Sequence, residues 1–167
     1  MAGMTNWLES GMAALLALLA VPQVGLGAIF IIAFVSATLL PMGSEPAVFA
    51  LVKLRPDLFW PAVAVATLGN TLGGALTWWM GRAAKQAADQ WRASHGHPAQ
   101  RGAETASRWL LRYGPKACLL SWLPVVGDPL CAVAGWLRLP FWPCALYMAI
   151  GKCARYITMT SALLWIL

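Results

Sequence analysis

Two carboxylic acids stand at matching places in otherwise apolar segments of this sequence. Glu45 directly precedes Pro46, and Asp128 directly precedes Pro129. Proline suits the first position of a helix, and an acid one residue earlier can accept hydrogen bonds from the amides of the first turn. Both acids therefore fit helix caps. They also fit carboxyl groups that take and release a proton, and the sequence leaves both interpretations open.

Two cations, Lys152 and Arg155, lie within the apolar segment 141–167. Because they are three residues apart, they share one face of a helix. If the segment crosses a bilayer, each charge costs on the order of 2.5 to 3.5 kcal/mol and should be paired. The two acids and two cations balance, which is typical of a structural ion-pair network. The alternative is that the cations bind an anionic headgroup or phosphate, with helix N-termini near the acids adding donors.

A polar residue also interrupts the apolar segment 60–80. Asn70 takes the place there that Lys152 takes in the later segment, and it lies on a stripe of small residues that would let two membrane helices approach closely. Asn70 therefore serves either packing or the site. Arg82, just past the end of the segment, reaches either the membrane surface or a cavity beside the acids.

The segments that must position these residues form a duplication. Residues 38–46 match residues 121–129, and the match continues with Leu54-Arg55 on Leu137-Arg138 and Phe59-Trp60-Pro61 on Phe141-Trp142-Pro143. Each copy contains a broken apolar segment, a basic turn and a long apolar helix. Repeats of this kind point to a binding site between the two halves of a membrane transporter.

Prolines break the first apolar segment of each copy, Pro41 and Pro46 in one and Pro124 and Pro129 in the other. The arms on either side hold roughly ten residues, whereas a helix needs about 20 to cross a hydrocarbon core. We therefore expect two re-entrant hairpins with these prolines at their tips. Non-helical backbone survives at membrane depth only against protein or a water-lined cavity, so the tips should face each other or a cavity.

Composition places the chain in a membrane. Of its 167 residues, 60% are hydrophobic and only 11% are charged, and the mean hydropathy is +0.66. Segments 60–80 and 141–167 are long enough to be simple spans. The four cysteines lie in apolar segments without metal or redox spacing, so the sequence predicts no metal and no cofactor.

The longest polar stretch, residues 82–116, is rich in Lys and Arg. By the positive-inside rule it is cytoplasmic. The net charge of +6 lies mostly in this stretch and favours contact with anionic lipid, not nucleic acid. A hairpin that returns to its own side, followed by one crossing helix, starts the second copy on the opposite side, so the repeat should be inverted.

These patterns predict an all-α integral membrane protein, an inverted repeat of a re-entrant helical hairpin plus a transmembrane helix. The expected divisions are an N-terminal apolar or interfacial segment at 1–23, repeat 1 at 24–81, the basic cytoplasmic loop at 82–116 and repeat 2 at 117–167. Whether residues 7–22 span the membrane is left open.

Short motifs spread over residues 36–156 carry a resemblance to a known family. They are Ser36 to Glu45, Gly69 to Gly74, Trp79 to Arg82, Arg112 to Gly114, Ser121 to Asp128, Ala134 to Trp136, Gly151-Lys152 and Arg155-Tyr156. With them the chain resembles the DedA family of VTT-domain membrane proteins, most closely its small YqaA-type branch. The resemblance implies opposed re-entrant hairpins, a bacterial inner membrane, and translocation of undecaprenyl phosphate or phospholipid in envelope homeostasis. It also implies that Glu45 and Arg82 occupy positions that are important in the family.

One departure from the family pattern concerns charge. DedA proteins place two arginines in the second hairpin, and those positions here are Ser121 and Gly127, with Cys131 in place of a proline. Lys152 and Arg155 either replace that positive charge from the neighbouring helix or indicate a different substrate.

We therefore expect a transporter, flippase or scramblase for an anionic lipid or polyprenyl-phosphate carrier, with proton coupling and homo-oligomerisation as open features. No enzyme is expected, because covalent catalysis needs a nucleophile and a base in reach and both histidines lie in the polar stretch. A proton-coupled transporter of a small solute and a structural or regulatory subunit are the alternatives.

Overall fold

The computed structural model describes residues 22–39, 44–95, 112–123 and 126–166. Every regular element in these ranges is helical, which confirms the all-α class for this part of the chain. In chain order the elements are α2 (Pro22–Leu39), α3 (Glu45–Leu54), η1 (Pro56–Leu58), α4 (Phe59–His95), η2 (Gly114–Trp122), α6 (Gly127–Trp136) and α7 (Phe141–Ile166). The expected tip residues Pro41 and Pro124 and the segment 7–21 lie outside the described residues.

The first half of the chain turns sharply between α3 and α4. Arg55 leaves the helical conformation after α3, and its guanidinium binds Asp57 in the 3-10 turn η1 at 3.0 Å. The hydrogen bond from Arg55 holds the pKa of Asp57 below its usual range. Both side chains are substantially exposed, so this ion pair contributes little to stability.

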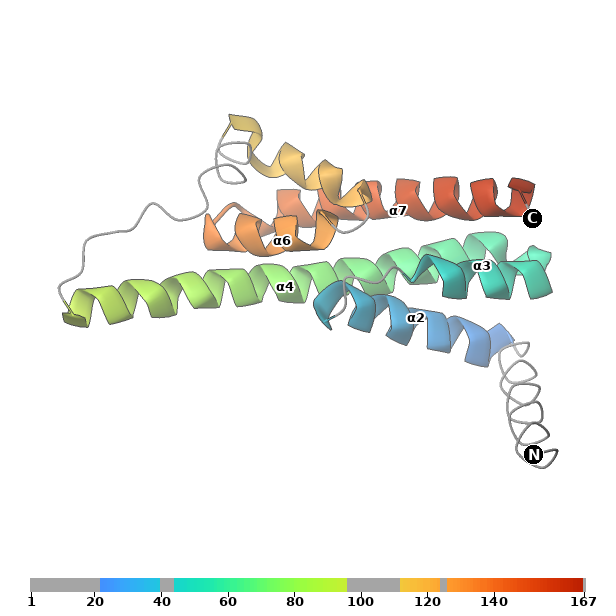
Figure 1. The fold of residues 1–167 in the computed structure, drawn as a ribbon, viewed down its shortest axis with the longest axis horizontal. Helices are drawn as coiled ribbons and strands as arrows, with labels where there is room; N and C mark the ends of the chain where they lie inside the picture. Colours follow the sequence, from blue (N-terminus) through green and yellow to red (C-terminus); the bar gives the residue numbers. More distant parts are fainter. Residues whose placement is uncertain (1–21, 40–43, 96–111, 124–125, 167) are drawn as a thin grey trace, which may run out of the picture.

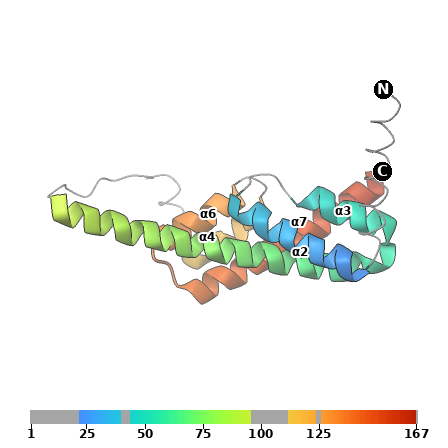
Figure 2. The ribbon, with the colours of Figure 1, turned by 90° about the horizontal axis from the view of Figure 1, so that it is seen from below.

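The helix α4 is 37 residues long and runs further than expected. Residues 82–95, expected as the start of the polar loop, instead continue the helix. Alanine, lysine, glutamine and arginine dominate this part and are strong helix formers, and Lys85 pairs with Asp89 one turn later at 2.9 Å. Figures 1 and 2 show this end of α4 projecting past the other described helices.

Each long helix packs against arms from both halves of the chain. α2 packs on α4, and η2 packs on α7. The second arm of each half, α3 or α6, also packs on the long helix of the other half. α3 contacts α7, and α6 contacts α4. In Figure 1, α3 and α6 run in opposite directions along the long axis, and α7 lies antiparallel to α4.

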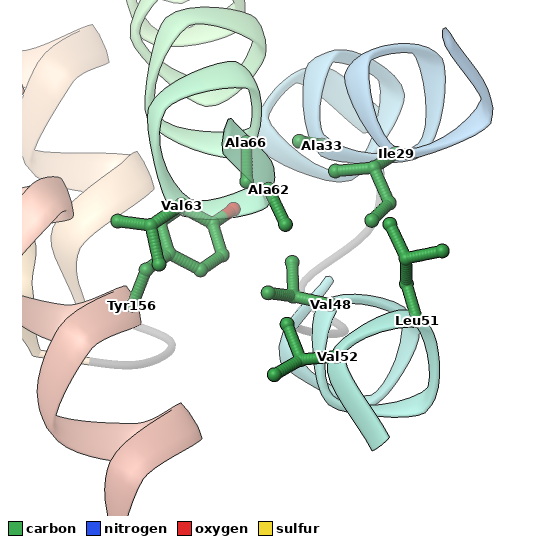
Figure 3. Close-up of a cluster of buried hydrophobic side chains, with 9 residues drawn as sticks. All are labelled: Ile29, Ala33, Val48, Leu51, Val52, Ala62, Val63, Ala66 and Tyr156. Atoms are coloured by element: carbon green, nitrogen blue, oxygen red, sulfur yellow. The ribbon is translucent and has the colours of Figure 1, made fainter. Parts of the chain in front are cut away.

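Two clusters of buried side chains hold this arrangement together. The first, drawn in Figure 3, joins α2, α3, α4 and α7 and consists of Ile29, Ala33, Val48, Leu51, Val52, Ala62, Val63, Ala66 and Tyr156. The second joins α4, η2, α6 and α7 and consists of Trp78, Ala117, Cys118, Cys131, Ala134, Cys144 and Met148. Each cluster therefore packs one pair of arms, α2 with α3 or η2 with α6, against both α4 and α7.

Glycines on α4 allow the arms to come close. A Cβ atom at Gly69 or Gly73 would lie 2.5 or 2.6 Å from a backbone oxygen of α2. One at Gly81 would collide with the backbone of Ala132 on α6. These positions agree with the interpretation of the glycine stripe as a packing surface.

In the part of the chain that the structure describes, no helix is both long and apolar enough to qualify as a membrane span, and this holds for segments 60–80 and 141–167, where spans were expected. Small and polar residues within both helices, such as Asn70 and Gly73 in α4 and Lys152 and Arg155 in α7, lower their hydropathy.

Candidate functional site

The first of two buried ion pairs joins α3 to α7. Oε1 of Glu45, in the first turn of α3, lies 2.9 Å from Nε of Arg155, and the two side chains are 9% and 4% exposed. These two atoms are at ion-pair distance, although among the described residues neither has a well-aligned hydrogen bond. Attraction between charges therefore holds this pair together, in surroundings where water screens it little.

The second ion pair joins α6 to α7. Nζ of Lys152 lies 2.9 Å from Oδ1 of Asp128, and it also donates to the backbone oxygen of Asn70 on α4 at 2.6 Å. The Lys152 side chain is fully buried, whereas that of Asp128 is 22% exposed. Gly74 makes room for the ammonium group, because a Cβ atom there would lie 2.9 Å from Nζ.

A tyrosine connects the surroundings of the two pairs. The side-chain amide of Asn70 donates to the hydroxyl of Tyr156 at 2.7 Å, and the hydroxyl of Ser44 is hydrogen-bonded to the same oxygen. Tyr156 is fully buried and lies beside Arg155, whose guanidinium carbon is 5.5 Å from its ring centroid. Side chains from α3, α4, α6 and α7, together with Ser44 just before α3, thus form one polar network.

Neither acid takes the capping position expected from the sequence. Ser44 precedes α3 and Val126 precedes α6 as the capping residues, and neither makes a capping hydrogen bond through its side chain. Glu45 and Asp128 lie inside the first turns instead, each followed by its proline, Pro46 or Pro129. Negative charge in a first turn is favourable to the helix dipole, but the partners of both carboxylates are the cations of α7.

Arg82 does not join this network. It lies more than three turns beyond Asn70 on α4, about 18 Å along the helix axis, and its guanidinium stacks over the ring of Trp78 at 5.5 Å. The other expected site residues with described side chains, Glu45, Asp128, Lys152, Arg155 and Asn70, are brought together.

Ser44 and Tyr156 are network members that the sequence analysis did not propose as site residues, although both lie in motifs that carry the family resemblance. Tyr156 follows Lys152 by one helical turn, so its helical spacing is the signal that could have pointed to it. Ser44 directly precedes Glu45, but no spacing rule connects it to a tyrosine so much later in the chain.

The network also contains buried polar atoms without partners. Within the described ranges, Oδ1 of Asn70 and the hydroxyl of the neighbouring Thr71 have no hydrogen bond. Each such atom costs about 1–3 kcal/mol. No group of three or more His, Cys, Asp or Glu side chains in these ranges could hold a metal ion.

The four charged groups of this arrangement balance one another. While both acids are ionised, they neutralise both cations. If Glu45 or Asp128 took up a proton, its cation would be left buried without a counter-charge, which is unfavourable by several kcal/mol. An anionic group entering the site would then be bound by Lys152 or Arg155.

The fold and this network define an all-helical protein with charges gathered between its two halves, and comparison with known proteins identifies its family. The sequence pattern of the VTT domain matches residues 9–163. The chain is 38% identical to the inner membrane protein YqaA of Escherichia coli (strain K12) over 135 residues, which cover 80% of this chain and 87% of that protein. It is 41% identical over 137 residues to an uncharacterized protein of Haemophilus influenzae, covering 78% and 82% of the two chains.

The chain belongs to the VTT-domain family of membrane proteins, also called the DedA family, which confirms the resemblance seen in its motifs. The name of the Escherichia coli relative supports a place in a bacterial inner membrane. No solved structure matches the chain.

Proposed function

We propose that this protein moves an anionic lipid across the bacterial inner membrane and that Lys152 and Arg155 receive its headgroup. The observation that carries the proposal is the pairing of each cation on α7 with an acid from a different arm, Glu45 of α3 and Asp128 of α6. A phospholipid and a polyprenyl phosphate such as undecaprenyl phosphate both carry the required negative charge.

The proposal includes proton coupling, which the charges of the site support. A proton on Glu45 or Asp128 would remove the partner of one cation, and a buried cation without a partner is strongly unfavourable. The arrival of a lipid phosphate would restore neutrality. Proton uptake and lipid binding would therefore favour each other, and release of the lipid would require loss of the proton.

The exchanged packing of the arms supports an inverted repeat of two re-entrant hairpins around α4 and α7. In this proposal, movement of α3 or α6 against α7 would open the site toward one side of the membrane, and residues 82–116 would face the cytoplasm. No covalent step, metal or cofactor takes part. Proteins with such repeats bind substrates where their halves meet.

A structural or regulatory role is the second candidate, and one observation favours it. Both acids already have a cation within 2.9 Å, so the network is neutral without any ligand. Buried ion pairs of this kind can specify how helices pack without binding anything.

Lipid translocation by the purified protein in liposomes tests the proposal. Labelled phosphatidylglycerol and undecaprenyl phosphate would each be followed between leaflets, with and without a proton gradient, against protein-free liposomes. We expect faster movement of at least one anionic lipid and a dependence of its rate on the gradient. If neither lipid moves faster under any gradient, lipid transport is excluded, and transport of a small solute or the structural role takes its place.

A further inference from the structure

A cavity of about 480 Å³ lies between η2 and α7, on a different face of α7 from the charge network. From η2 it is lined by Leu119, Leu120 and Trp122, among others, and from α7 by Ile150, Gly151 and Ala154. Its volume falls in the range of about 300–1,000 Å³ that is typical of small-molecule sites. Its walls are almost entirely apolar.

Small residues on α7 form the hollow. Gly151 and Ala154 lie on adjoining turns and leave space where larger side chains would fill the gap to η2. The hollow cannot close by moving η2 nearer, because a Cβ atom at Gly151 would already lie 2.5 Å from the backbone oxygen of Leu119. Backbone contact thus fixes the spacing of the two helices beside the cavity.

Basic side chains gather at the end of the cavity where η2 begins. Lys116 and Tyr113 both line the cavity, and Lys116 is exposed. The guanidinium of Arg112 is 5.9 Å from the ring centroid of Tyr113. Lys116 therefore lines one end of an apolar hollow, and Arg112 lies next to that end against the ring of Tyr113. This charge pattern matches a lipid with a negative headgroup.

We infer that this cavity binds an acyl chain of an anionic phospholipid, whose headgroup lies against Lys116 and Arg112. An acyl chain fits because the apolar walls offer no partners to water, whereas a hydrocarbon chain contacts them favourably. η2 holds nine residues, about 18 Å at the rise of a 3-10 helix, and this length gives the acyl chain an elongated path along the cavity. The inference concerns binding alone and does not depend on transport.

Photocrosslinking tests this inference. The full-length protein would be placed in phosphatidylcholine vesicles containing either phosphatidylglycerol or phosphatidylcholine with a diazirine in one acyl chain, and crosslinked peptides would be mapped by mass spectrometry. We expect crosslinks concentrated at residues 119–122 and 150–154. The anionic probe should be favoured about fivefold for each basic contact.

Three variants make the test specific. Ala154→Trp fills the cavity and should remove these crosslinks, whereas Ala162→Trp, at an exposed position on the same helix, should leave them as in the wild type. Lys116→Gln changes an exposed side chain, so folding is preserved, and it should reduce the preference for the anionic probe about fivefold.

Several results would overturn the inference. One is crosslinking of the exposed side chains Leu68 and Leu72 on α4 as strong as that of residues 119–122 and 150–154. Another is equal capture of the two probes by the wild type. Absence of crosslinks at residues 119–122, because another part of the chain or a second copy covers the cavity, would also exclude it.

Discussion

Lys152 has the most constrained charge in the described part of the molecule. It is fully buried, and its ammonium group has one carboxylate and one backbone oxygen as partners. An ammonium ion so enclosed depends on both, because water cannot replace them. Its removal also leaves the Asp128 carboxylate without its cation.

Lys152→Met should therefore destabilise the protein by about 3–5 kcal/mol, the cost of removing one partner of a buried pair. That corresponds to a fall in Tm on the order of 10 °C. Thermal unfolding in detergent, followed by size-exclusion chromatography, measures this. The double variant Lys152→Met with Asp128→Asn should regain most of the loss, and a double variant as unstable as the single one would show that the ion pair is not the source.

Gly74 offers a way to disturb the same ammonium group from α4. In Gly74→Val the new Cβ atom would lie only 2.9 Å from Nζ of Lys152 and push the ammonium group aside, so the contact with Asp128 should break and Tm should fall. Gly27→Val is the matched control, because a Cβ atom there has no neighbour within 4 Å. Equal Tm values for the two variants would contradict the role given to Gly74.

At the scale of elements, the docking of α6 on α4 depends on another glycine. A Cβ atom at Gly135 would collide with the backbone oxygen of Trp78. Gly135→Val should separate the two helices and expose Cys131, which is 1% exposed in the structure. Labelling with a maleimide, located by mass spectrometry, should rise several-fold at Cys131. Unchanged protection of Cys131 would mean that α6 stays docked without this close approach.

The sequence allowed the charged members of the network to be predicted because charge is conspicuous in apolar segments. Glu45, Asp128, Lys152 and Arg155 were recognisable from their residue types and from the repeat. Which acid meets which cation could not be predicted, because that depends on the exchange of α3 and α6 between the long helices. Tyr156 was missed because a tyrosine in an apolar helix fits ordinary packing equally well.

The helix ends were harder to predict than the helices. Residues 82–95 carry many charges, a composition equally suited to a loop and to a solvent-facing helix. Helix propensity and the Lys85–Asp89 pair favour the helix. The positions of Glu45 and Asp128 in first turns, not at caps, also differ from expectation by only a residue or two.

At the scale of the whole molecule, the projecting end of α4 is tied to the chain between α6 and α7. Asp89 pairs with Lys85 at 2.9 Å and with Arg138 at 3.2 Å. The hydrogen bond from Lys85 and the nearby cations lower the pKa of Asp89. Its stabilising contribution is therefore present above its usual pKa of about 4 and is lost as the pH falls through the lowered pKa.

Asp89→Asn should consequently lower Tm slightly at pH 6 and by less at pH 3, where part of the stabilising contribution of the wild-type carboxylate has already been lost. The effect is small because both ion pairs are partly exposed. Thermal unfolding of the two proteins at both pH values provides the comparison. A difference that grows toward low pH would have the wrong sign and would exclude this ion pair as its origin.

We propose that the acids and cations between the two halves form a transport site, not only a structural network. Glu45→Gln tests it most directly, because glutamine keeps the shape of the side chain and can still contact Arg155, but it cannot exchange a proton. Translocation of labelled phosphatidylglycerol and undecaprenyl phosphate in liposomes would be compared for wild type and variant, with Tm measured on the same preparations. We expect a variant that still folds, with a lower Tm because Arg155 has lost its counter-charge, and that has lost transport driven by a proton gradient. A folded variant that moves lipid at the wild-type rate and with the same gradient dependence would contradict it.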